Sequence, residues 1–296
     1  MITKYSKEVL GTNFEIILED KNDEVINLCF LELERIENKF SRFKKKSHLN
    51  QINSNLNTWQ EIDLEFKYLI EKSLEISSKT KGHFDICLKS TLENLGYDSK
   101  YSFKEKKLIN SKSKYNQIKK IFQRNIKIKD NKLYIREEIE FGGIGKGYAL
   151  DKLSKILDEK LIEKYLINGG GDIVCKTKKI DDAWKIHLEH PEDNKKIIGE
   201  IKIRNGSIAS SSSRVRKWKM NHHLINSKTK TPENSVKSIY VLSKKGIYSD
   251  AYATALFTSG FDRAIEISKK LNLEIFIISN KNQIYISKNF NVKLYD

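Results

Sequence analysis

The chain has 296 residues and a formal charge of +16, from 55 Lys and Arg against 39 Asp and Glu. Its 39% hydrophobic and 32% charged residues describe a polar globular protein, long enough for one large domain or two interleaved lobes. No apolar run could span a membrane, and the lysines are spread along the chain, so we expect neither an integral membrane segment nor a nucleic-acid surface.

The cysteines indicate neither a disulfide framework nor a zinc site, because Cys29, Cys87 and Cys175 are odd in number and far apart. Each is expected to be a small core residue. The residues after Met1 are strand-like and lack the apolar segment of a signal peptide. We therefore expect a cytoplasmic protein, or an exported one if the sequence is a trimmed piece.

The first part of the chain predicts a strand and two helices. Residues 5–19 alternate as in one strand, and Gly11 within it suggests a bulge or a close approach of another backbone. Apolar residues at helical spacing predict helices over 23–40 and 64–79, the second ending before a turn at 80–85 with a buried aromatic residue. The expected buried stripe of the first helix is Val25, Ile26, Leu28, Cys29, Leu33 and Ile36.

The rest of the chain predicts short strands around two further helices. A central helix is expected over about 147–161 and a long one over 249–271. Residues 97–120 are expected to form a surface excursion, and residues 210–219 a loop of serines followed by basic residues. Alternating runs predict strands at 121–128, 133–135, 184–189, 197–203, 238–242, 273–278 and 283–286. The expected fold is α+β, with mixed and antiparallel sheets and packed helices. We expect one domain over residues 1–296, with the ligand in a cleft between two interleaved lobes.

Two glycine clusters, at 142–147 and 169–171, bracket the central helix. Glycines at a helix start let the backbone approach a ligand and place the positive end of the helix dipole against an anion. Lys146 adds a positive charge in the same turn. The spacing matches neither a P-loop nor a dinucleotide fingerprint. The clusters predict a site for a phosphate-bearing ligand, with a tight turn that binds nothing as the alternative.

A second candidate site lies at the start of the last helix, where Ser249 or Asp250 is a natural N-cap. Asp250 and Thr254 are four residues apart, so their side chains project from one helix face. A carboxylate and a hydroxyl are hard oxygen ligands, which Mg²⁺ accepts together with substrate phosphates. The alternative is a capping Asp and a Thr bonded back to its own helix.

His222 and His223 are adjacent in the sequence and would face opposite ways on a strand, so they cannot easily share a metal. One histidine beside the basic loop is a candidate for contact with a diphosphate or for proton transfer. The alternative for each is a surface histidine or a core histidine with satisfied hydrogen bonds.

Taken together, these segments resemble the FAD:protein FMN transferase (ApbE) family, in order and over nearly the whole chain. The first elements that carry the resemblance are Leu10-Gly11-Thr12, Phe40-Ser41-Arg42-Phe43 with Ser47 and Asn53, and Thr80, Gly82, Phe84 and Asp85 followed by Leu95-Gly96-Tyr97. The later ones are GGIGKGYALD at 142–151, Asn168 with Gly170, Gly171 and Asp172, and Asp250 with Ala251 and Thr254. The resemblance rests on all six elements at compatible spacing, since no single one is decisive.

The resemblance implies an activity. Enzymes of this family bind FAD, use Mg²⁺ and transfer the FMN half of FAD to a threonine hydroxyl of an acceptor flavoprotein, with release of AMP. By the same resemblance, Asp250, Thr254 and the backbone carbonyl of Gly145 would hold Mg²⁺. The expected catalytic residues are His223, Lys146 and Asp250. The expected FAD-binding residues are Gly11, Thr12, Asp85, Gly143, Lys146, Gly147, Asp151, Gly170, Gly171, Asp172, Ser211 and His223.

The chain departs from the family pattern in two loops that border the expected phosphate site. Ser212 stands where the family has glycine, and Asn226, Ser227 and Lys230 stand where it has Asp, Pro and Gly. These changes leave two alternatives to transfer open. One is Mg²⁺-dependent hydrolysis of FAD to FMN and AMP, and the other is a protein that binds FAD without catalysis.

Overall fold

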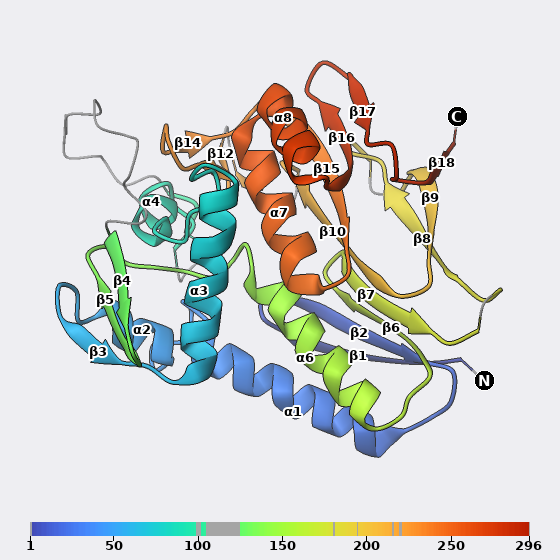
Figure 1. Cartoon of the computed structure of the whole chain (residues 1–296), viewed down its shortest axis with the longest axis horizontal. Helices are drawn as coiled ribbons and strands as arrows, with labels where there is room; N and C mark the ends of the chain where they lie inside the picture. The colour runs from blue at the N-terminus through green and yellow to red at the C-terminus, as the bar shows by residue number, and fades with distance from the viewer. Residues whose placement is uncertain are drawn as a thin grey trace.

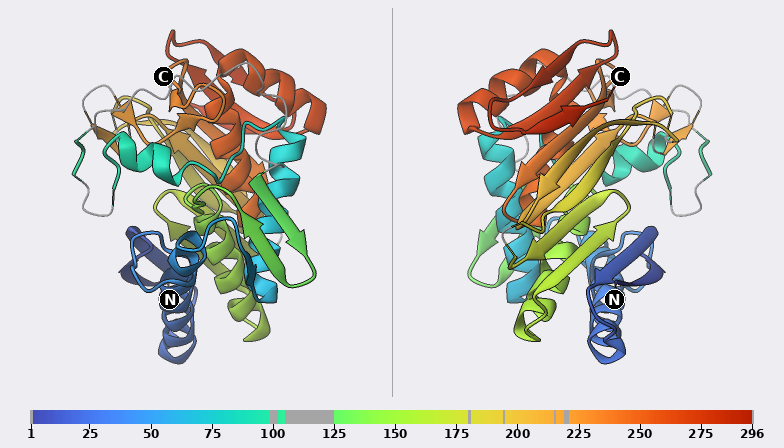
Figure 2. Two further views of the ribbon diagram at one scale, coloured as in Figure 1. Left: turned by 90° about the vertical axis from the view of Figure 1, so that its left-hand side faces the viewer. Right: turned by 90° about the vertical axis from the view of Figure 1, so that its right-hand side faces the viewer.

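The computed structural model describes residues 2–98, 102–104, 125–179, 181–193, 195–214, 216–218 and 221–295. An eight-stranded sheet carries the large helices on one face and a smaller three-stranded sheet on the other (Figure 1) (Figure 2). The α+β class with helices packed on antiparallel strands is therefore confirmed.

The large sheet has the strand order β1-β2-β6-β7-β10-β15-β16-β17, and each of these described neighbours is antiparallel. Its strands are β1 (Thr3–Val9), β2 (Thr12–Leu18), β6 (Lys164–Gly169), β7 (Asp172–Thr177), β10 (Gly206–Ser212), β15 (Val236–Ser243), β16 (Glu274–Ser279) and β17 (Ile284–Ile286). Side chains alternate between its faces. In β15, Ile239 and Val241 therefore join the core under the helices, while Tyr240 joins a second core.

The second core lies between the large sheet and a sheet of order β18-β9-β8. These strands are β8 (Trp184–Glu189), β9 (Ile197–Ile203) and β18 (Val292–Leu294). The remaining short strands are β3 (Trp59–Glu61), β4 (Ile126–Lys129), β5 (Lys132–Ile135), β11 (Lys217–Trp218), β12 (Asn221–His222), β13 (Ile225–Asn226) and β14 (Thr231–Pro232).

The helices are α1 (Asp23–Phe40), α2 (His48–Asn53), α3 (Leu64–Lys79), α4 (Lys89–Asn94), α6 (Gly145–Glu159), α7 (Gly246–Ser259) and α8 (Phe261–Leu271). Helices α1 and α3 have the expected bounds. Both carry side-chain N-caps, since Asn22 accepts from the N–H of Val25 and Asp63 from the N–H of Phe66. The three cysteines are buried and unpaired, as expected.

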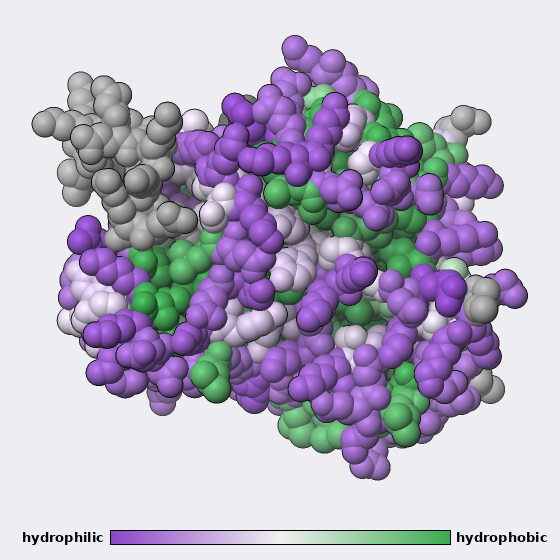
Figure 3. Space-filling view, viewed as in Figure 1, coloured by the Kyte–Doolittle hydropathy of each residue, from purple (hydrophilic) through white to green (hydrophobic). Residues whose placement is uncertain are grey.

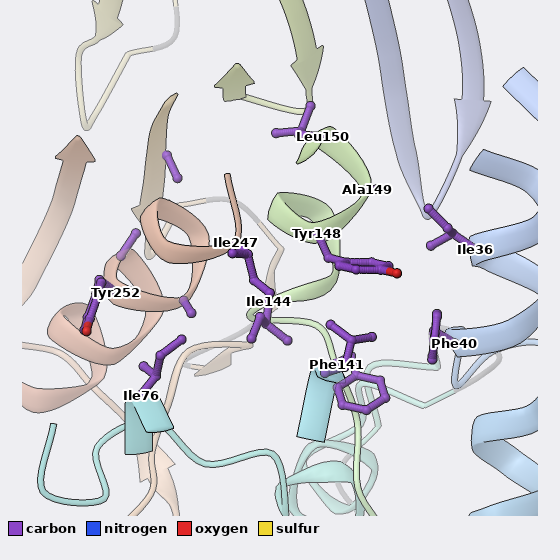
Figure 4. Close-up of a cluster of buried hydrophobic side chains, with 14 of the residues drawn as sticks. Ile36, Phe40, Ile76, Phe141, Ile144, Tyr148, Ala149, Leu150, Ile247 and Tyr252 are labelled. Carbon is purple, nitrogen blue, oxygen red and sulfur yellow. The ribbon is translucent and has the colours of Figure 1, made fainter. Parts of the chain in front are cut away.

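The glycine turn before α6 is anchored in the main core. Phe141, Ile144 and Tyr148 point into this core and gather with Phe40 and Ile247 (Figure 4). The Phe40 ring lies edge-on at 5.7 Å from Phe141 and 6.1 Å from Tyr148, measured between ring centroids. Because these side chains pack on both sides of the turn, its glycines are held in one place despite their intrinsic freedom.

Residues 5–19 form a hairpin, so the expected single strand with a bulge at Gly11 is wrong. β1 and β2 pair from Thr3 opposite Leu18 to Val9 opposite Thr12. Leu10 and Gly11 form the connection, with φ of 56° and 70°. Two successive left-handed residues are what a type I′ hairpin turn requires.

The expected helix over 249–271 is two helices. α7 begins at Gly246, and Gly260, with φ of 83°, separates it from α8. Asp250 therefore lies in the second turn of α7 and is not its N-cap, and neither is Ser249. Nearly every residue of α7 is buried, so no change from polar to apolar residues marks where the helix starts.

Smaller expectations are also wrong. Leu28, expected to be buried, is 38% exposed. Residues 210–212 complete β10 and do not belong to a loop, and helix α2 is not among the expected elements. The central helix starts two residues early, at Gly145. Residues 121–124 of one expected strand, and most of the excursion at 97–120, lie outside the described residues.

None of the helices in the described part of the chain combines the length and apolar character that a membrane span needs. The face that carries the helices is mainly hydrophilic, with small separate apolar areas (Figure 3).

Candidate functional site

Two glycine turns meet at the N-terminal end of α6. The first, at 142–145, leads into the helix, and the second, Gly170-Gly171, joins β6 to β7 with φ of 67° and 97°. A Cβ on Gly170 would overlap the Thr12 hydroxyl, so the second turn crosses the start of β2 at a distance that only glycine allows. The positive φ of Gly170 and Gly171 also favours glycine at both positions.

One lysine joins three elements of the fold at this point. The Nζ of Lys146 in α6 forms an ion pair with Asp172 at the start of β7 and lies 3.7 Å from Oδ1 of Asp250 in α7. Both carboxylates are buried. We call Lys146, Asp172 and Asp250 the acid–lysine cluster. It brings together three residues that the sequence predicted separately for one site.

Backbone donors fix the two carboxylates. Oδ1 of Asp172 accepts from the N–H of Ser210 at 3.1 Å, and Oδ2 of Asp250 accepts from the N–H of Gly147 at 2.8 Å. Each carboxylate thus keeps one oxygen on the backbone and turns the other toward Lys146. These bonds tie β10 and α7 to the glycine turns.

The cluster holds two acids and one base, so with all three ionised it carries one net negative charge. Burial is the main cause that raises the pKa of Asp250, and the charge of Asp172 adds to it against the opposing Lys146. Burial lowers the pKa of Lys146, but the two carboxylates outweigh that effect and raise it. A buried site with excess negative charge favours a further cation.

Thr254, one turn after Asp250, lies against the first glycine turn. A Cβ on Gly143 would lie 2.8 Å from Cγ2 and 3.0 Å from Oγ1 of Thr254. Asp250 at Gly147 and Thr254 at Gly143 therefore place a carboxylate and a hydroxyl beside the start of α6, and such hard oxygen donors fit Mg²⁺. The N–H of Gly145 bonds to the carbonyl of Phe141 at 2.7 Å. Among the described residues no group of three or more His, Cys, Asp and Glu could hold a metal.

Asp151 determines where α7 begins. Its carboxylate accepts from the N–H groups of Gly246 at 2.6 Å and Ile247 at 3.0 Å, which are the first residues of that helix. Burial raises the pKa of Asp151 to about 6, against the effect of these two hydrogen bonds. α6 and α7 cross so closely that a Cβ on Gly147 would overlap the carbonyl of Gly246. Contact of Asp151 with FAD stays a prediction.

The two adjacent histidines occupy different environments. His222 is a core histidine, 2% exposed, with Nε2 3.0 Å from the carbonyl of Glu233 and with Nδ1 accepting from the N–H of Leu224. The ring of His223 lies 6.3 Å from the Tyr97 ring, between centroids. The core alternative therefore holds for His222, whereas the role of His223 in the reaction stays a prediction.

The bonds that Asp85 and Ser211 form in the described structure do not involve the acid–lysine cluster. Asp85 accepts from the N–H of Cys87 at 2.8 Å, and its other oxygen lies 3.4 Å from Nζ of Lys230. Lys230 has φ of 59°, a conformation that suits the glycine of the family pattern. Ser211 is buried in β10 beside Ser210. Their contacts with FAD stay predictions.

Sequence reasoning missed two charged residues near the glycine turns. Glu140 is buried and accepts from the N–H of Gly142 at 2.7 Å, so it holds the turn from its N-terminal side. Its position directly before a glycine cluster was an available signal. Arg216 donates from Nη2 to the carbonyl of Gly11 at 3.3 Å. No local pattern singles out Arg216, because its loop carries several basic residues.

Motif residues outside the cluster brace the segment that leads into it. Asn53 binds both backbone groups of Ile139, each at 2.8 Å. Ser47 caps α2, which carries Asn53, by accepting from the N–H of Asn50. Arg42 donates to the carbonyl of Tyr97 at 2.9 Å. The motif residues at 40–53 therefore help to hold the segment that precedes the first glycine turn.

Two cavities flank this region. One of about 560 Å³ has Cys87, Arg136 and Lys230 in its lining. A second of about 1050 Å³ runs along α6 and has Tyr148 and Lys152 in its lining. Neither is lined by the acid–lysine cluster. Binding of the ligand in a cleft between lobes stays a prediction.

Comparison with known proteins gives a consistent set of relatives. A family model described as the ApbE family matches residues 10–277. The FAD:protein FMN transferase of Buchnera aphidicola subsp. Schizaphis graminum is 27% identical over 302 residues, which cover 95% of this chain and 87% of the relative. That of Haemophilus influenzae is 25% identical over 303 residues, which cover 97% and 87%.

Solved structures share the fold. The ApbE protein from Thermotoga maritima superimposes with a TM-score of 0.87 at 24% identity, over 98% of each chain. The flavin transferase ApbE from Vibrio cholerae gives a TM-score of 0.84 at 20% identity, again over 98% of each chain. The similarity extends over nearly the whole chain.

Proposed function

This chain belongs to the ApbE family, and from that premise we propose that it transfers the FMN half of FAD to a threonine hydroxyl of an acceptor protein, with release of AMP. The observation that carries the proposal is the acid–lysine cluster, assembled between two glycine turns from three distant segments. The curated relatives that match over most of this chain are named for FMN transfer from FAD.

The N-terminus of α6 is the proposed site of the FAD diphosphate. A helix N-terminus attracts anions through its N–H groups and dipole, and the glycines at 142–145 leave space for a ligand to approach the backbone. The N–H of Gly147 already binds Asp250, so that group positions the acid. Lys146 adds positive charge beside the same helix end.

Asp250, Thr254 and a backbone carbonyl of the first glycine turn would hold Mg²⁺. When bound, the cation would supply charge neutralisation for the transferring phosphoryl group. Lys146 keeps Asp250 in place, because it lies between that carboxylate and Asp172. The chain thus positions the hard oxygen donors before any ligand arrives.

In the proposed reaction the acceptor oxygen forms a bond to the FMN phosphorus, and the bond from that phosphorus to the AMP oxygen breaks. The electron pair leaves with AMP, and the proton of the threonine hydroxyl must pass to a base. We assign that base to His223, which lies beside the aromatic ring of Tyr97.

The experiment combines the protein, FAD, Mg²⁺ and a threonine-bearing acceptor, and follows AMP release and the mass of the acceptor. We expect release of AMP and a gain in acceptor mass of one FMN less one water, and neither result with an acceptor whose threonine is replaced by valine. Free FMN with an unchanged acceptor would identify a hydrolase instead. Retained FAD without AMP would identify a binding protein.

A further inference from the structure

Arg216 lies at the tip of the β1–β2 hairpin, which the second glycine turn crosses. Its Nη2 donates to the carbonyl of Gly11 at the tip of the β1–β2 hairpin, at 3.3 Å, and its guanidinium lies 5.9 Å from the Tyr97 ring centroid. Thr12, the next residue of the hairpin, lies against the second glycine turn, since a Cβ on Gly170 would overlap its hydroxyl oxygen. The arginine therefore lies beside the segment that contacts the second glycine turn, which leads into Asp172, the ion-pair partner of Lys146.

The guanidinium is largely unused by the protein. Within the part of the chain that the structure describes, its side chain forms one hydrogen bond, to Gly11, and no ion pair. A guanidinium carries five N–H donors in a planar fork that matches phosphate oxygens. Most of these donors are therefore available to a ligand.

The negative charge of the acid–lysine cluster favours a further cationic side chain near a bound diphosphate. Lys146 already lies between Asp172 and Asp250, and the acid–lysine cluster as a whole is negative when ionised. A diphosphate brought to the adjacent helix end would add negative charge at short range, where repulsion is weakly screened. Arg216, which forms no ion pair with the residues that the structure describes, would offset that repulsion from within the protein.

The backbone of Arg216 supports a functional role. Its φ is 56°, in the left-handed region that residues other than glycine rarely adopt. Such conformations persist where the surroundings enforce them, and they gather at ligand-binding sites. We propose that Arg216 contacts the diphosphate of FAD directly, beside the N-terminus of α6. This inference rests on the proposed function, since it names a further substrate contact of the same site.

The test compares Arg216→Gln and Arg216→Lys with the matched variant Arg214→Gln. Arg214 lies on the same loop, but its charge acts on Tyr240, whose side chain belongs to the second core. FAD binding is followed by flavin fluorescence without added metal, and inorganic diphosphate serves as a competitor. For Arg216→Gln we expect Kd for FAD and the inhibition constant for diphosphate both to rise about 10- to 100-fold. Arg216→Lys should lie between, and Arg214→Gln should match the wild type.

Unchanged FAD and diphosphate affinity in Arg216→Gln would overturn the inference. So would a loss of FAD affinity with unchanged competition by diphosphate, because the arginine would then act on another part of the ligand. If Arg216→Gln does not fold, a wild-type affinity of Arg216→Lys for both ligands overturns it equally. Failure of the proposed function is a separate result, namely wild-type protein that binds FAD but modifies no acceptor.

Discussion

Helix α6 contributes to two clusters of charge with opposite balance. In the acid–lysine cluster one lysine serves two carboxylates, and burial raises the pKa of Asp250. In the second, which we call the Glu65 cluster (Glu65, Arg35, Lys39 and Tyr148), one carboxylate has three donors. Arg35 binds it through two N–H groups at 2.6 and 2.8 Å, Lys39 at 2.6 Å, and the Tyr148 hydroxyl completes the set. Burial alone would raise the pKa of Glu65, but these donors hold it at about 2.

The difference in charge balance distinguishes a cluster that stabilises the fold from one that is suited to bind a ligand. The Glu65 cluster has the donors it needs from α1 and α6, so it joins those helices to the start of α3 and has no need of a ligand. The acid–lysine cluster has more acid than base, so it is stabilised by whatever cation arrives. A carboxylate buried with too few donors lowers the stability of the free protein, and such groups are typical of functional sites.

The largest expected effect is on catalysis. Asp250→Ala should lower the rate of AMP release at least about 1000-fold, because it removes the principal oxygen donor proposed for Mg²⁺. The free energy of unfolding should fall by no more than about 1–3 kcal/mol, since the N–H of Gly147 loses its partner while a buried charge is also removed. Turnover assays and thermal unfolding without metal give the two numbers. A wild-type rate would refute the assignment of Asp250.

The Glu65 cluster should show the reverse pattern. Glu65→Gln should lower the free energy of unfolding by about 1.5–3 kcal/mol at pH 7 and leave the rate per folded molecule unchanged. Because the pKa of Glu65 is lowered in the folded state, its contribution is present above pH 4.5 and is lost as pH falls toward about 2. Urea unfolding across that window measures it. Equal stability of variant and wild type at pH 7 would contradict a structural role.

In the described structure the carboxylate of Asp151 accepts hydrogen bonds from two backbone N–H groups. Its pKa therefore shows the effect of burial on a carboxylate without a cationic hydrogen-bond donor. Its pKa is raised from 3.8 to about 6, so the folded state disfavours the charged form and stability is lost as pH rises through 6. Asp151→Asn removes the charge but also weakens the cap of α7. Relative to the wild type, the variant should gain up to about 3 kcal/mol of unfolding free energy between pH 4 and pH 7. A pH-independent difference would show that burial does not control this group.

The smallest expected effect comes from the edge of the Glu65 cluster. Nζ of Lys152 lies 3.9 Å from Oε1 of Glu65, and its side chain is 35% exposed. Exposed pairs of this kind contribute little, so Lys152→Gln should change the free energy of unfolding by no more than about 0.5 kcal/mol. Chemical denaturation beside Glu65→Gln makes the comparison direct. A loss as large as that of Glu65→Gln would mean that the cluster depends on Lys152 as well.

Features that depend on near neighbours in the sequence were predictable. Helices α1 and α3 have the expected bounds because their N-caps and their apolar spacing are local signals. The second glycine turn, Gly170-Gly171, was expected for a similar reason, since it needs a backbone conformation that glycine adopts freely. Asp250 and Thr254 were expected on one face of a helix, which follows from their spacing alone.

Features that depend on distant partners were not predictable in this way. The hairpin at Leu10-Gly11 was not predicted, because a bulge and a hairpin turn use the same residue types. The start of α7 at Gly246 was not predicted, because a helix buried on nearly all sides has no polar face to mark its first residue.

The sequence by itself determined helices α1 and α3, the second glycine turn and the types of side chain available for a phosphate and metal site. Only the tertiary structure decided that Lys146 lies between Asp172 and Asp250, that Asp151 caps α7, and that Arg216 binds the tip of the β1–β2 hairpin. The physical reason is that the partner of a buried charge is chosen by the packing of whole elements, whereas caps, turns and helical faces are chosen within a few residues.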